Sequence, residues 1–587
     1  MKEMKGSEIV IRALERANVE TIFAYPGGAS MELHQALQDS TLKVVLPRHE
    51  QGGGFAAAGY ARATGKTGVC MATSGPGATN LLTAIADAYM DSVPVVFITG
   101  QVPMSLIGKN AFQEIDIVGM TRPVVKHNYL VLDVEDIPNI IAEAFYLANS
   151  GRPGPVLIDV PKNIQQATCI PVFPEEVTVR AYRPEHKLKD TDVKKLRDMI
   201  EESERPCIYC GGGIITANAT AELKQFAETY NIPVCTTLMG VGAVPEDHPL
   251  SLKWLGMHGT VYANNAANES DLLICLGARF DDRVTGPAET FAATSKKVHV
   301  DIDNSELNKN VDVDLQILAD VKDLLLAMNE APMYKDYTKW HDQIKYWKKT
   351  FPLTYKSDDN IVQPQFVMEE LCRLTNGEAI IVPGVGQHQM FAAQYYTYKY
   401  PRHYITSGGL GTMGFATPTA MGIKVALPDA LVVNIDGDGS FQMNIQELGT
   451  LSQEEIGVKM VILNNQHLGM VAQWEDRFYN SKRGNTVLIN EKVDRPFPDF
   501  VSIAKGYGIP GREVYHRDEL EDAIKEMLAT DGPFVLDVHT GYTEHVLPMI
   551  PAGKTYKDII VDLEVNPCIN CSVQKCKLQK KNSCSKK

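Results

Sequence analysis

The sequence predicts an α/β protein of three doubly wound domains, each built on a parallel sheet. Three successive segments of similar length alternate helical periodicity with short apolar strands, which is the pattern of such domains. At 587 residues the chain is also too long for a single hydrophobic core. We therefore expect domains at residues 1–170, 190–340 and 363–545, with a C-terminal segment at 546–587.

The first segment contains strands at 95–98 and 156–159 and glycine-rich turns at 25–29 and 73–80. Between these turns Glu50 begins a stretch of glycines, alanines and Phe55 that predicts a buried helix. A buried carboxylate needs a partner, because an unpaired buried charge is expensive. For an isolated glutamate, the favourable interaction with a helix N-terminus is sufficient explanation.

Residues 171–189 are charged, contain prolines and lack periodicity, so we expect a linker. The second segment places Gly211, Gly212 and Gly213 after one strand and Asp301 at the end of another. This arrangement is typical of dinucleotide sites, although it is not GxGxxG and is a weak signal alone. Residues 333–359 predict a helix and a second linker.

The third segment carries the most specific pattern. An apolar strand at 431–435 runs into Asp436-Gly-Asp438-Gly-Ser440, and a second strand at 459–463 is followed by Asn464-Asn465. Mg²⁺ prefers oxygen ligands such as those of Asp438 and Asn465, and glycines let phosphates approach the backbone. The pattern indicates a diphosphate and a divalent metal at strand ends; two polar turns after core strands are the alternative.

Composition excludes several classes of function. The net charge is −15 and no aromatic-interleaved basic stripe occurs, so nucleic acid is not expected as a partner. No apolar run reaches the length of about 18 residues that a membrane span needs. Residues 1–20 read as an amphipathic helix with acidic residues rather than a targeting peptide, so we expect a cytoplasmic protein.

The 11 cysteines fall into two groups. Those in the body of the chain lie in apolar contexts and are expected to be reduced core residues, including the pair Cys207 and Cys210. Four more lie near the C-terminus, among lysines: Cys568, Cys571, Cys576 and Cys584. Four thiols can bind Zn²⁺ or an iron-sulfur cluster, but the spacing matches no standard finger, and a flexible reduced tail is the alternative.

Several motifs together resemble those of the thiamine diphosphate (ThDP)-dependent 2-keto acid enzymes, and most closely the acetohydroxyacid (acetolactate) synthase catalytic subunits. The motifs are YPGGAS, RHEQGG, ATSGPGATNL, AFQE, GMHGT, GARFDDRVTG, GLGTMGF, GDGSFQMNIQEL and NNQHLGMVAQWE. The resemblance implies a ThDP pyrimidine-binding domain first, a central FAD-binding-like domain and a diphosphate-binding domain last. Thr417-Pro418-Thr419 departs from the usual pattern but removes no expected ligand.

The resemblance also implies roles for individual residues. Glu50 would hydrogen-bond N1′ of the ThDP aminopyrimidine, and Met413 would support the bent cofactor. Gly28, Gln113 and Arg283 are the other implied catalytic positions, with Arg283 binding the carboxylate of the second substrate; a salt bridge to the neighbouring aspartates is its alternative. Implied ThDP contacts are Gly386, Gln387, His388, Gly411, Gly439, Ser440, Gly469 and Met470, and the main chain of His467 would join Asp438 and Asn465 on Mg²⁺. The implied substrate pocket contains Phe112, Lys162, Met257, Val471 and Trp474.

A flavin is implied by the same resemblance. Its positions are Arg152, Gly211, Gly212, His258, Gly259, Thr260, Gly277, Arg279, Asp301, Ile302 and Asp320. The overall reaction is redox-neutral, so the FAD would be structural.

The activity implied is decarboxylation of pyruvate and transfer of the two-carbon unit to pyruvate or 2-ketobutyrate, for branched-chain amino acid biosynthesis. The products would be 2-acetolactate or 2-aceto-2-hydroxybutyrate. A pyruvate oxidase-like or other ThDP decarboxylase, and an inactive ligand-binding relative, are the alternatives. In similar enzymes the two halves of the site come from different subunits, so a homodimer or homotetramer is expected, with a small regulatory subunit as a further partner.

Overall fold

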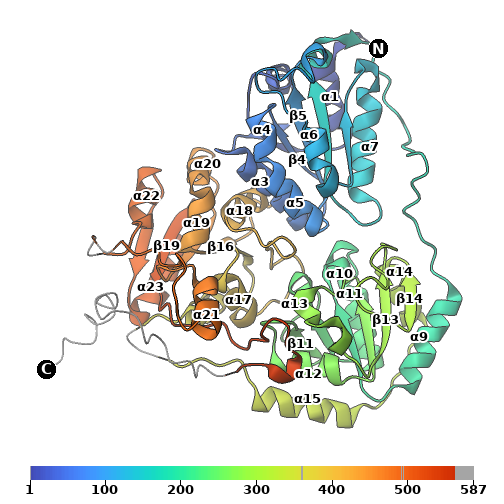
Figure 1. Cartoon of the computed structure of the whole chain (residues 1–587), viewed down its shortest axis with the longest axis vertical. Helices are drawn as coiled ribbons and strands as arrows, with labels where there is room; N and C mark the ends of the chain where they lie inside the picture. The colour runs from blue at the N-terminus through green and yellow to red at the C-terminus, as the bar shows by residue number, and fades with distance from the viewer. Residues whose placement is uncertain (1, 358–360, 491, 493–494, 562–587) are drawn as a thin grey trace.

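The structure, a computed structural model, describes residues 2–357, 361–490, 492 and 495–561. Over these residues the three α/β segments expected from the sequence are present as three separate parallel sheets (Figure 1). No helix in the described part of the chain is long and apolar enough to cross a membrane. The cysteine-rich tail, residues 568–584, lies outside the described residues.

The first sheet has the strand order β3-β2-β4-β5-β7-β6, with every ladder parallel. Its strands are β2 (Thr21–Ala24), β3 (Lys43–Val45), β4 (Gly68–Ala72), β5 (Val95–Gln101), β6 (His127–Leu130) and β7 (Val156–Pro161). Its helices are α1 (Gly6–Arg16), α2 (Met31–Gln38), α3 (Glu50–Thr64), α4 (Pro76–Asn80), α5 (Leu82–Met90), α6 (Ile117–Thr121), α7 (Ile137–Asn149) and α8 (Lys162–Gln166). A short antiparallel pair, β1 (Met4–Lys5) with β8 (Thr168–Cys169), was not expected from the sequence.

The middle sheet has the order β11-β10-β9-β12-β13-β14. Its strands are β9 (Pro206–Cys210), β10 (Val234–Thr236), β11 (Ser251–Trp254), β12 (Leu272–Leu276), β13 (Lys296–Asp301) and β14 (Leu315–Leu318). Its helices are α9 (Asp190–Glu202), α10 (Gly212–Thr216), α11 (Thr220–Tyr230), α12 (Val261–Glu269), α13 (Asp282–Thr285), α14 (Val321–Glu330) and α15 (Thr338–Thr350). Residues 170–189, which precede α9, form neither helix nor strand and run as an extended connection from the first domain (Figure 1).

The third sheet has the order β15-β16-β17-β19-β18. Its strands are β15 (Ile380–Pro383), β16 (Val432–Gly437), β17 (Lys459–Asn464), β18 (Gly511–Val514) and β19 (Phe534–His539). Its helices are α16 (Pro364–Leu374), α17 (Gln387–Tyr395), α18 (Ala416–Ala426), α19 (Asp438–Phe441), α20 (Leu448–Gln453), α21 (Gly469–Phe478), α22 (Phe500–Gly506) and α23 (Leu520–Ala529). The predicted strands at 431–435 and 459–463 are β16 and β17, so both polar motifs lie at carboxyl ends of adjacent strands.

Helices α3 and α18 pack against each other and join the first and third domains. A Cβ on Gly59 would lie 2.3 Å from the carbonyl oxygen of Thr419, and one on Gly422 would lie 1.9 Å from that of Ala56. One buried cluster accordingly contains residues of both domains, including Phe55 and Phe415. The glycines therefore permit a close helix contact at the point where the two domains meet.

Candidate cofactor site

Asp438 lies at the carboxyl end of β16 and is 2 % exposed. Its Oδ1 accepts a hydrogen bond from the N–H of Gly439 at 3.0 Å, whereas its buried Oδ2 makes none with a described residue. Burial raises the pKa of Asp438 to about 7, and nearby backbone N–H groups, including those of Gln466 and His467, only partly offset this. A buried carboxylate with a free oxygen fits a divalent cation, whose charge would replace the lost hydration.

Asn465 lies on the loop after β17 and is held by its neighbours. Its Nδ2 donates to Oε1 of Gln387 at 3.3 Å, and its Oδ1 accepts from the N–H of His467 at 3.0 Å. The ring of His467 stacks on Tyr542 with centroids 4.4 Å apart. A Cβ on Gly469 would lie 2.2 Å from Oε1 of Gln387, so a larger residue there would displace the end of this side chain. Gln387, His467 and Gly469 thus surround Asn465.

The glycines of this edge leave room beside His388. Gly386 has φ +155° and precedes α17, and a Cβ on Gly437 would lie 2.7 Å from Nδ1 of His388. Burial lowers the pKa of His388 to about 3, so its ring is neutral, with Nε2 3.4 Å from Asp436. The result is an uncharged, glycine-lined wall that an anionic diphosphate can approach.

Met413 and Ser440 close the same edge. The methyl carbon of Met413 lies 3.6 Å from the Cβ position of Gly439, and Oγ of Ser440 accepts from the N–H of Gly414 at 3.0 Å. Gly411 has φ +72°, with little near its Cβ position. Met470 packs at the margin of the third domain's core. The structure therefore brings Met413 beside the glycine motif, although the two are apart in sequence.

Glu50 begins α3 in the first domain. Its Oε2 accepts from Nδ2 of Asn80 at 2.9 Å, and its Oε1 lies 3.2 Å from the Cβ position of Gly77. Gln113 adopts φ +60° and lies against Gly75 of the same turn. Gly28 is exposed, with no atom within 4 Å of its Cβ position. Glu50 is thus a carboxylate surrounded by small residues, and its Oε1 is not used by Asn80.

A buried carboxylate that the sequence reasoning did not single out fixes the start of α3 to the third domain. Glu447, 0 % exposed, accepts from the N–H groups of Arg48 and His49 at 3.1 and 3.0 Å and from Oγ1 of Thr450 at 2.9 Å. Burial raises its pKa to about 7. Glu447 lies in the motif NIQEL, and this motif is the sequence signal from which Glu447 could have been predicted. Glu447 therefore sets the position of the α3 N-terminus relative to α19.

A second polar bridge crosses the same boundary. Buried Arg62 contacts Asp87 at 3.0 Å and Asp91 at 2.9 Å. Asp91 accepts from the N–H groups of Gly408 and Gly409 at 3.0 and 2.7 Å, and Asp87 accepts from Ser407. These contacts hold the loop that leads to Met413 against the first domain.

Two of the five expected substrate-pocket residues, Phe112 and Val471, are exposed, and the other three are half-buried. Phe112 is 88 % exposed and Val471 is 52 % exposed, whereas Trp474 packs against Phe478 with ring centroids 5.1 Å apart. Arg283 has an exposed side chain, with Nη1 3.9 Å from Sδ of Met257 and Nε 3.9 Å from Asp282. Lys162 is half-buried at the start of α8. The long distance to Asp282 leaves the Arg283 guanidinium able to take another anion.

The residues expected to hold a flavin lie around the carboxyl edge of the middle sheet, and several already have protein partners. Arg152 contacts Glu306 at 2.6 Å and Asp303 at 3.4 Å. Thr260 and Asp320 cap α12 and α14 with their side chains. Gly211 and Gly213 pack against the backbone of Gly277. His258 is buried beside the carbonyl oxygen of Pro548. A Cβ on Gly259 would contact the backbone of Leu255. Arg279 reaches toward Gly409, and Ile302 follows Asp301 at the end of β13.

Asp301 is the carboxylate among the flavin candidates that lies at the end of strand β13. Burial raises its pKa to about 6, and its Oδ1 accepts from the N–H of Asp303 at 2.8 Å. A carboxylate at a strand end is the arrangement that binds a ribose hydroxyl in dinucleotide sites. A Cβ on Gly212 would lie 3.4 Å from its nearest neighbour, Cβ of Met239, so this glycine is less confined than Gly211.

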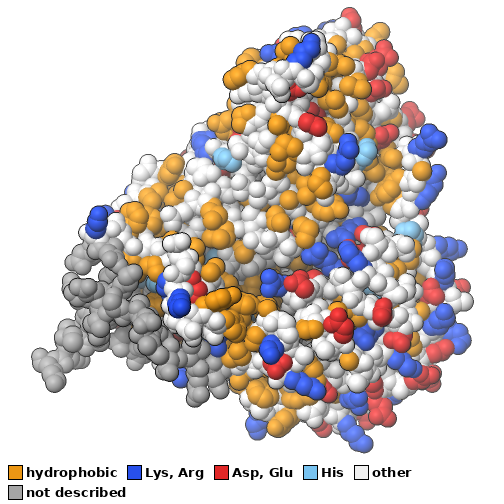
Figure 2. Space-filling model, in the orientation of Figure 1, with side chains coloured by type: hydrophobic (Ala, Val, Ile, Leu, Met, Phe, Trp, Pro, Cys, Tyr) orange, Lys and Arg blue, Asp and Glu red, His pale blue; other side chains and the backbone are white. Residues whose placement is uncertain are grey.

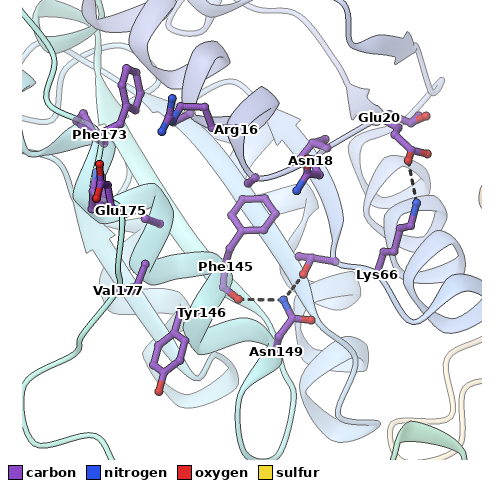
Figure 3. Close-up of a pocket in the computed structure, with 18 of the residues that line it drawn as sticks. Arg16, Asn18, Glu20, Lys66, Phe145, Tyr146, Asn149, Phe173, Glu175 and Val177 are labelled. Carbon is purple, nitrogen blue, oxygen red and sulfur yellow. Dashed lines mark hydrogen bonds and ion pairs between the residues drawn. The ribbon is translucent and has the colours of Figure 1, made fainter. Parts of the chain in front are cut away.

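A cavity of about 840 Å³ lies apart from these residues, on the first domain (Figure 3). Figure 3 shows Arg16, Phe145 and Phe173 around it, with Glu20 paired to Lys66 at one end. None of the predicted cofactor or substrate residues lines it. The candidate cofactor and substrate residues therefore lie outside this cavity.

Three family models match the chain, one for each domain. Residues 4–120 match the thiamine pyrophosphate enzyme N-terminal TPP binding domain, 193–328 the central domain and 384–538 the C-terminal TPP binding domain. Together with the glycine-lined edge at Asp438 and the Glu50 carboxylate, they define the class: this is a thiamine pyrophosphate-dependent enzyme.

Curated relatives narrow the class. The chain is 54% identical over 569 residues to "Acetolactate synthase 1, chloroplastic" of Zea mays, which covers 95% of this chain and 89% of the relative. It is 53% identical over 568 residues to "Acetolactate synthase, chloroplastic" of Arabidopsis thaliana, covering 95% of this chain and 84% of the relative. The chain belongs to the acetolactate synthase family.

Proposed function

We propose that the chain is the catalytic subunit of an acetolactate synthase. It would join the two-carbon unit of one decarboxylated pyruvate to a second pyruvate or to 2-ketobutyrate, in branched-chain amino acid biosynthesis. The observation that carries the proposal is the meeting of Glu50's helix α3 with α18, which follows directly on Met413. The proposed domain limits are 1–170, 190–340 and 363–545.

Mg²⁺ would be held by Asp438, Asn465 and the main chain of His467, beside a diphosphate at Gly386–His388, Gly439, Ser440 and Gly469. The unpartnered Oδ2 of Asp438 supports this proposal. Bound ThDP supplies a nucleophilic carbon and accepts the electrons released with CO₂. Glu50 would hold a proton between its free oxygen and the cofactor's ring nitrogen, and Met413 would orient the cofactor above Gly439.

Arg283 would bind the carboxylate of the second 2-keto acid, with Met257, Phe112, Val471 and Trp474 excluding water. Arg283 is exposed and weakly paired, and Phe112 and Val471 expose apolar surface that a substrate or a neighbouring chain would cover. Gln113, Gly28 and Lys162 would line the approach.

FAD would be a structural, non-redox ligand of the middle domain, beside Asp301, Arg152 and Gly211. The raised pKa of Asp301, caused first by burial, supports a polar partner there. The ion pairs of Arg152 would have to rearrange to bind a phosphate.

A homodimer or homotetramer is proposed, with a small regulatory subunit as a further partner. Large exposed apolar side chains on the first and third domains support association, namely Met31, Met104, Leu106, Phe112, Leu410, Met443, Val471 and Phe478. Figure 2 shows charged side chains crowding the middle domain, while apolar patches spread over the rest of this face. The contacts between α3 and α18 are made within one chain, and the expectation that the two halves of the site come from different subunits stays a prediction. A cytoplasmic location stays a prediction, and the names of the relatives specify chloroplasts.

The test is incubation of the protein with pyruvate, ThDP and Mg²⁺, with and without FAD. Acetolactate, measured by its acid conversion to acetoin, is the expected product in the presence of ThDP and Mg²⁺. Acetyl phosphate or hydrogen peroxide instead would favour the pyruvate oxidase alternative. Absence of any pyruvate consumption under all conditions would contradict the proposal.

A further inference from the structure

Glu513, Asp537 and His539 lie together on one face of the third sheet, outside the predicted cofactor set. Glu513 of β18 is directly opposite Asp537 of β19 in the parallel ladder. His539 follows two residues later, and side chains two apart in a strand share a face. Nε2 of His539 lies 3.7 Å from a carboxylate oxygen of each, and the three ligand atoms are all within 4.8 Å of one another.

Two of these side chains present buried polar atoms without partners among the described residues: Oδ1 of Asp537 and Nε2 of His539. Asp537 is 1 % exposed, and only its Oδ2 is satisfied, by Nδ2 of Asn464 at 3.3 Å. A buried polar atom left without a hydrogen bond costs about 1–3 kcal/mol. Nε2 of His539, which faces Glu513 and Asp537, therefore points to a missing ligand; the Asp537 oxygen nearest to it is Oδ2 and not the unpartnered Oδ1.

The charge around the cluster favours a cation. Burial raises the pKa of Asp537, and the carboxylates of Glu513, Asp438 and Asp499 raise it further. A protonated His539 could neutralise this charge, but burial lowers its pKa to about 4. At neutral pH the imidazole is therefore uncharged, which is the form that binds metal ions.

We propose that Glu513, Asp537 and His539 bind one divalent transition-metal ion, with Zn²⁺ as the best match to one nitrogen and two oxygen ligands. Ligand atoms about 2.1 Å from a tetrahedral ion lie about 3.4 Å apart. The two 3.7 Å separations from His539 are close to this value, and the separation of the two carboxylate oxygens is within 4.8 Å. The partly exposed Glu513 side chain leaves a fourth position open to water.

The site uses different ligands from Asp438 and Asn465 and has a different role. Its ligands come from β18, an edge strand, and from β19, the strand next to it. A bound ion would link these two strands, and through Asn464 it would also contact the end of β17. Its role is to fix the edge of the sheet that carries the cofactor motif.

The test is elemental analysis of Zn²⁺ bound to the full-length protein, dialysed against buffered micromolar Zn²⁺ with saturating Mg²⁺ and ThDP. Wild type is compared with Glu513→Gln, His539→Asn and the matched control His516→Ala, which removes an exposed histidine just beyond β18. The cysteine-rich tail is present in all four proteins and contributes the same background.

We expect Glu513→Gln and His539→Asn each to bind about one Zn²⁺ fewer per chain than wild type, and His516→Ala to equal wild type. Glu513 is exposed, so its substitution keeps the fold, which circular dichroism checks. Equal Zn²⁺ in Glu513→Gln and wild type would overturn the proposal, as would an equal loss in His516→Ala. Neither result depends on acetolactate formation.

Discussion

The contact between α3 and α18 gives the sharpest prediction. A Cβ on Gly422 would lie 1.9 Å from the carbonyl oxygen of Ala56, whereas ordinary contact begins at 3.4 Å. In Gly422→Ala the helices must therefore separate by about 1.5 Å, the difference between these distances. Misplacement of catalytic groups by about 1 Å costs roughly 10²-fold in rate. We expect acetolactate formation to fall by about that factor.

Stability should change much less than rate in Gly422→Ala. Overpacking lowers the free energy of unfolding by about 1–3 kcal/mol, and the better helix propensity of alanine raises it by about 1 kcal/mol. The assay is the initial rate at saturating ThDP and Mg²⁺, with urea unfolding in parallel. Gly506→Ala is the matched control, because this helical glycine has no atom within 4 Å of its Cβ position. A Gly422→Ala protein with wild-type rate and cofactor affinity would refute the reasoning.

Three further predictions concern charges. Arg62→Leu leaves its two buried carboxylate partners without their cation and should cost about 3–5 kcal/mol in urea unfolding, whereas Lys66→Ala, at an exposed pair, should cost much less. Burial raises the pKa of Asp159 to about 7, above its value of about 4 in an unfolded chain. The Asp159 side chain therefore stabilises the folded state fully below about pH 4, and this stabilisation is lost as the pH rises to about 7. Asp159→Asn should remove this part of the decline, measured by urea unfolding at pH 5 and 7.5; an unchanged decline would exclude Asp159 as its source. Arg283→Lys should raise the second keto acid requirement about ten- to hundredfold while CO₂ release changes little; equal losses in both would contradict its assignment.

Much of the fold could be predicted because its signals are local. The apolar strands at 431–435 and 459–463, the glycine turns and the small-residue helix after Glu50 each show in a short window of sequence. The structure extends β16 through Asp436 to Gly437, beyond the apolar run, because ladder hydrogen bonds use the backbone and do not depend on side-chain polarity.

The contacts that assemble the site could not be predicted in this way. Glu447 binds the backbone of Arg48 and His49 across the domain boundary, and no periodic pattern connects residues so distant in sequence. In the middle domain, the close approach of Gly211 to Gly277 accounts for a glycine without any ligand, so the flavin stays a prediction.

The most direct test of the account is hydrogen–deuterium exchange at C2 of bound ThDP in wild type and Glu50→Gln. Glutamine keeps the size of the side chain and the contact with Asn80 but cannot hold the proton, so ThDP binding should stay near wild type. Exchange should slow by roughly 10²- to 10⁴-fold, the usual contribution of a general acid or base. Wild-type exchange in Glu50→Gln, with the cofactor bound, would contradict the central claim that Glu50 activates the cofactor.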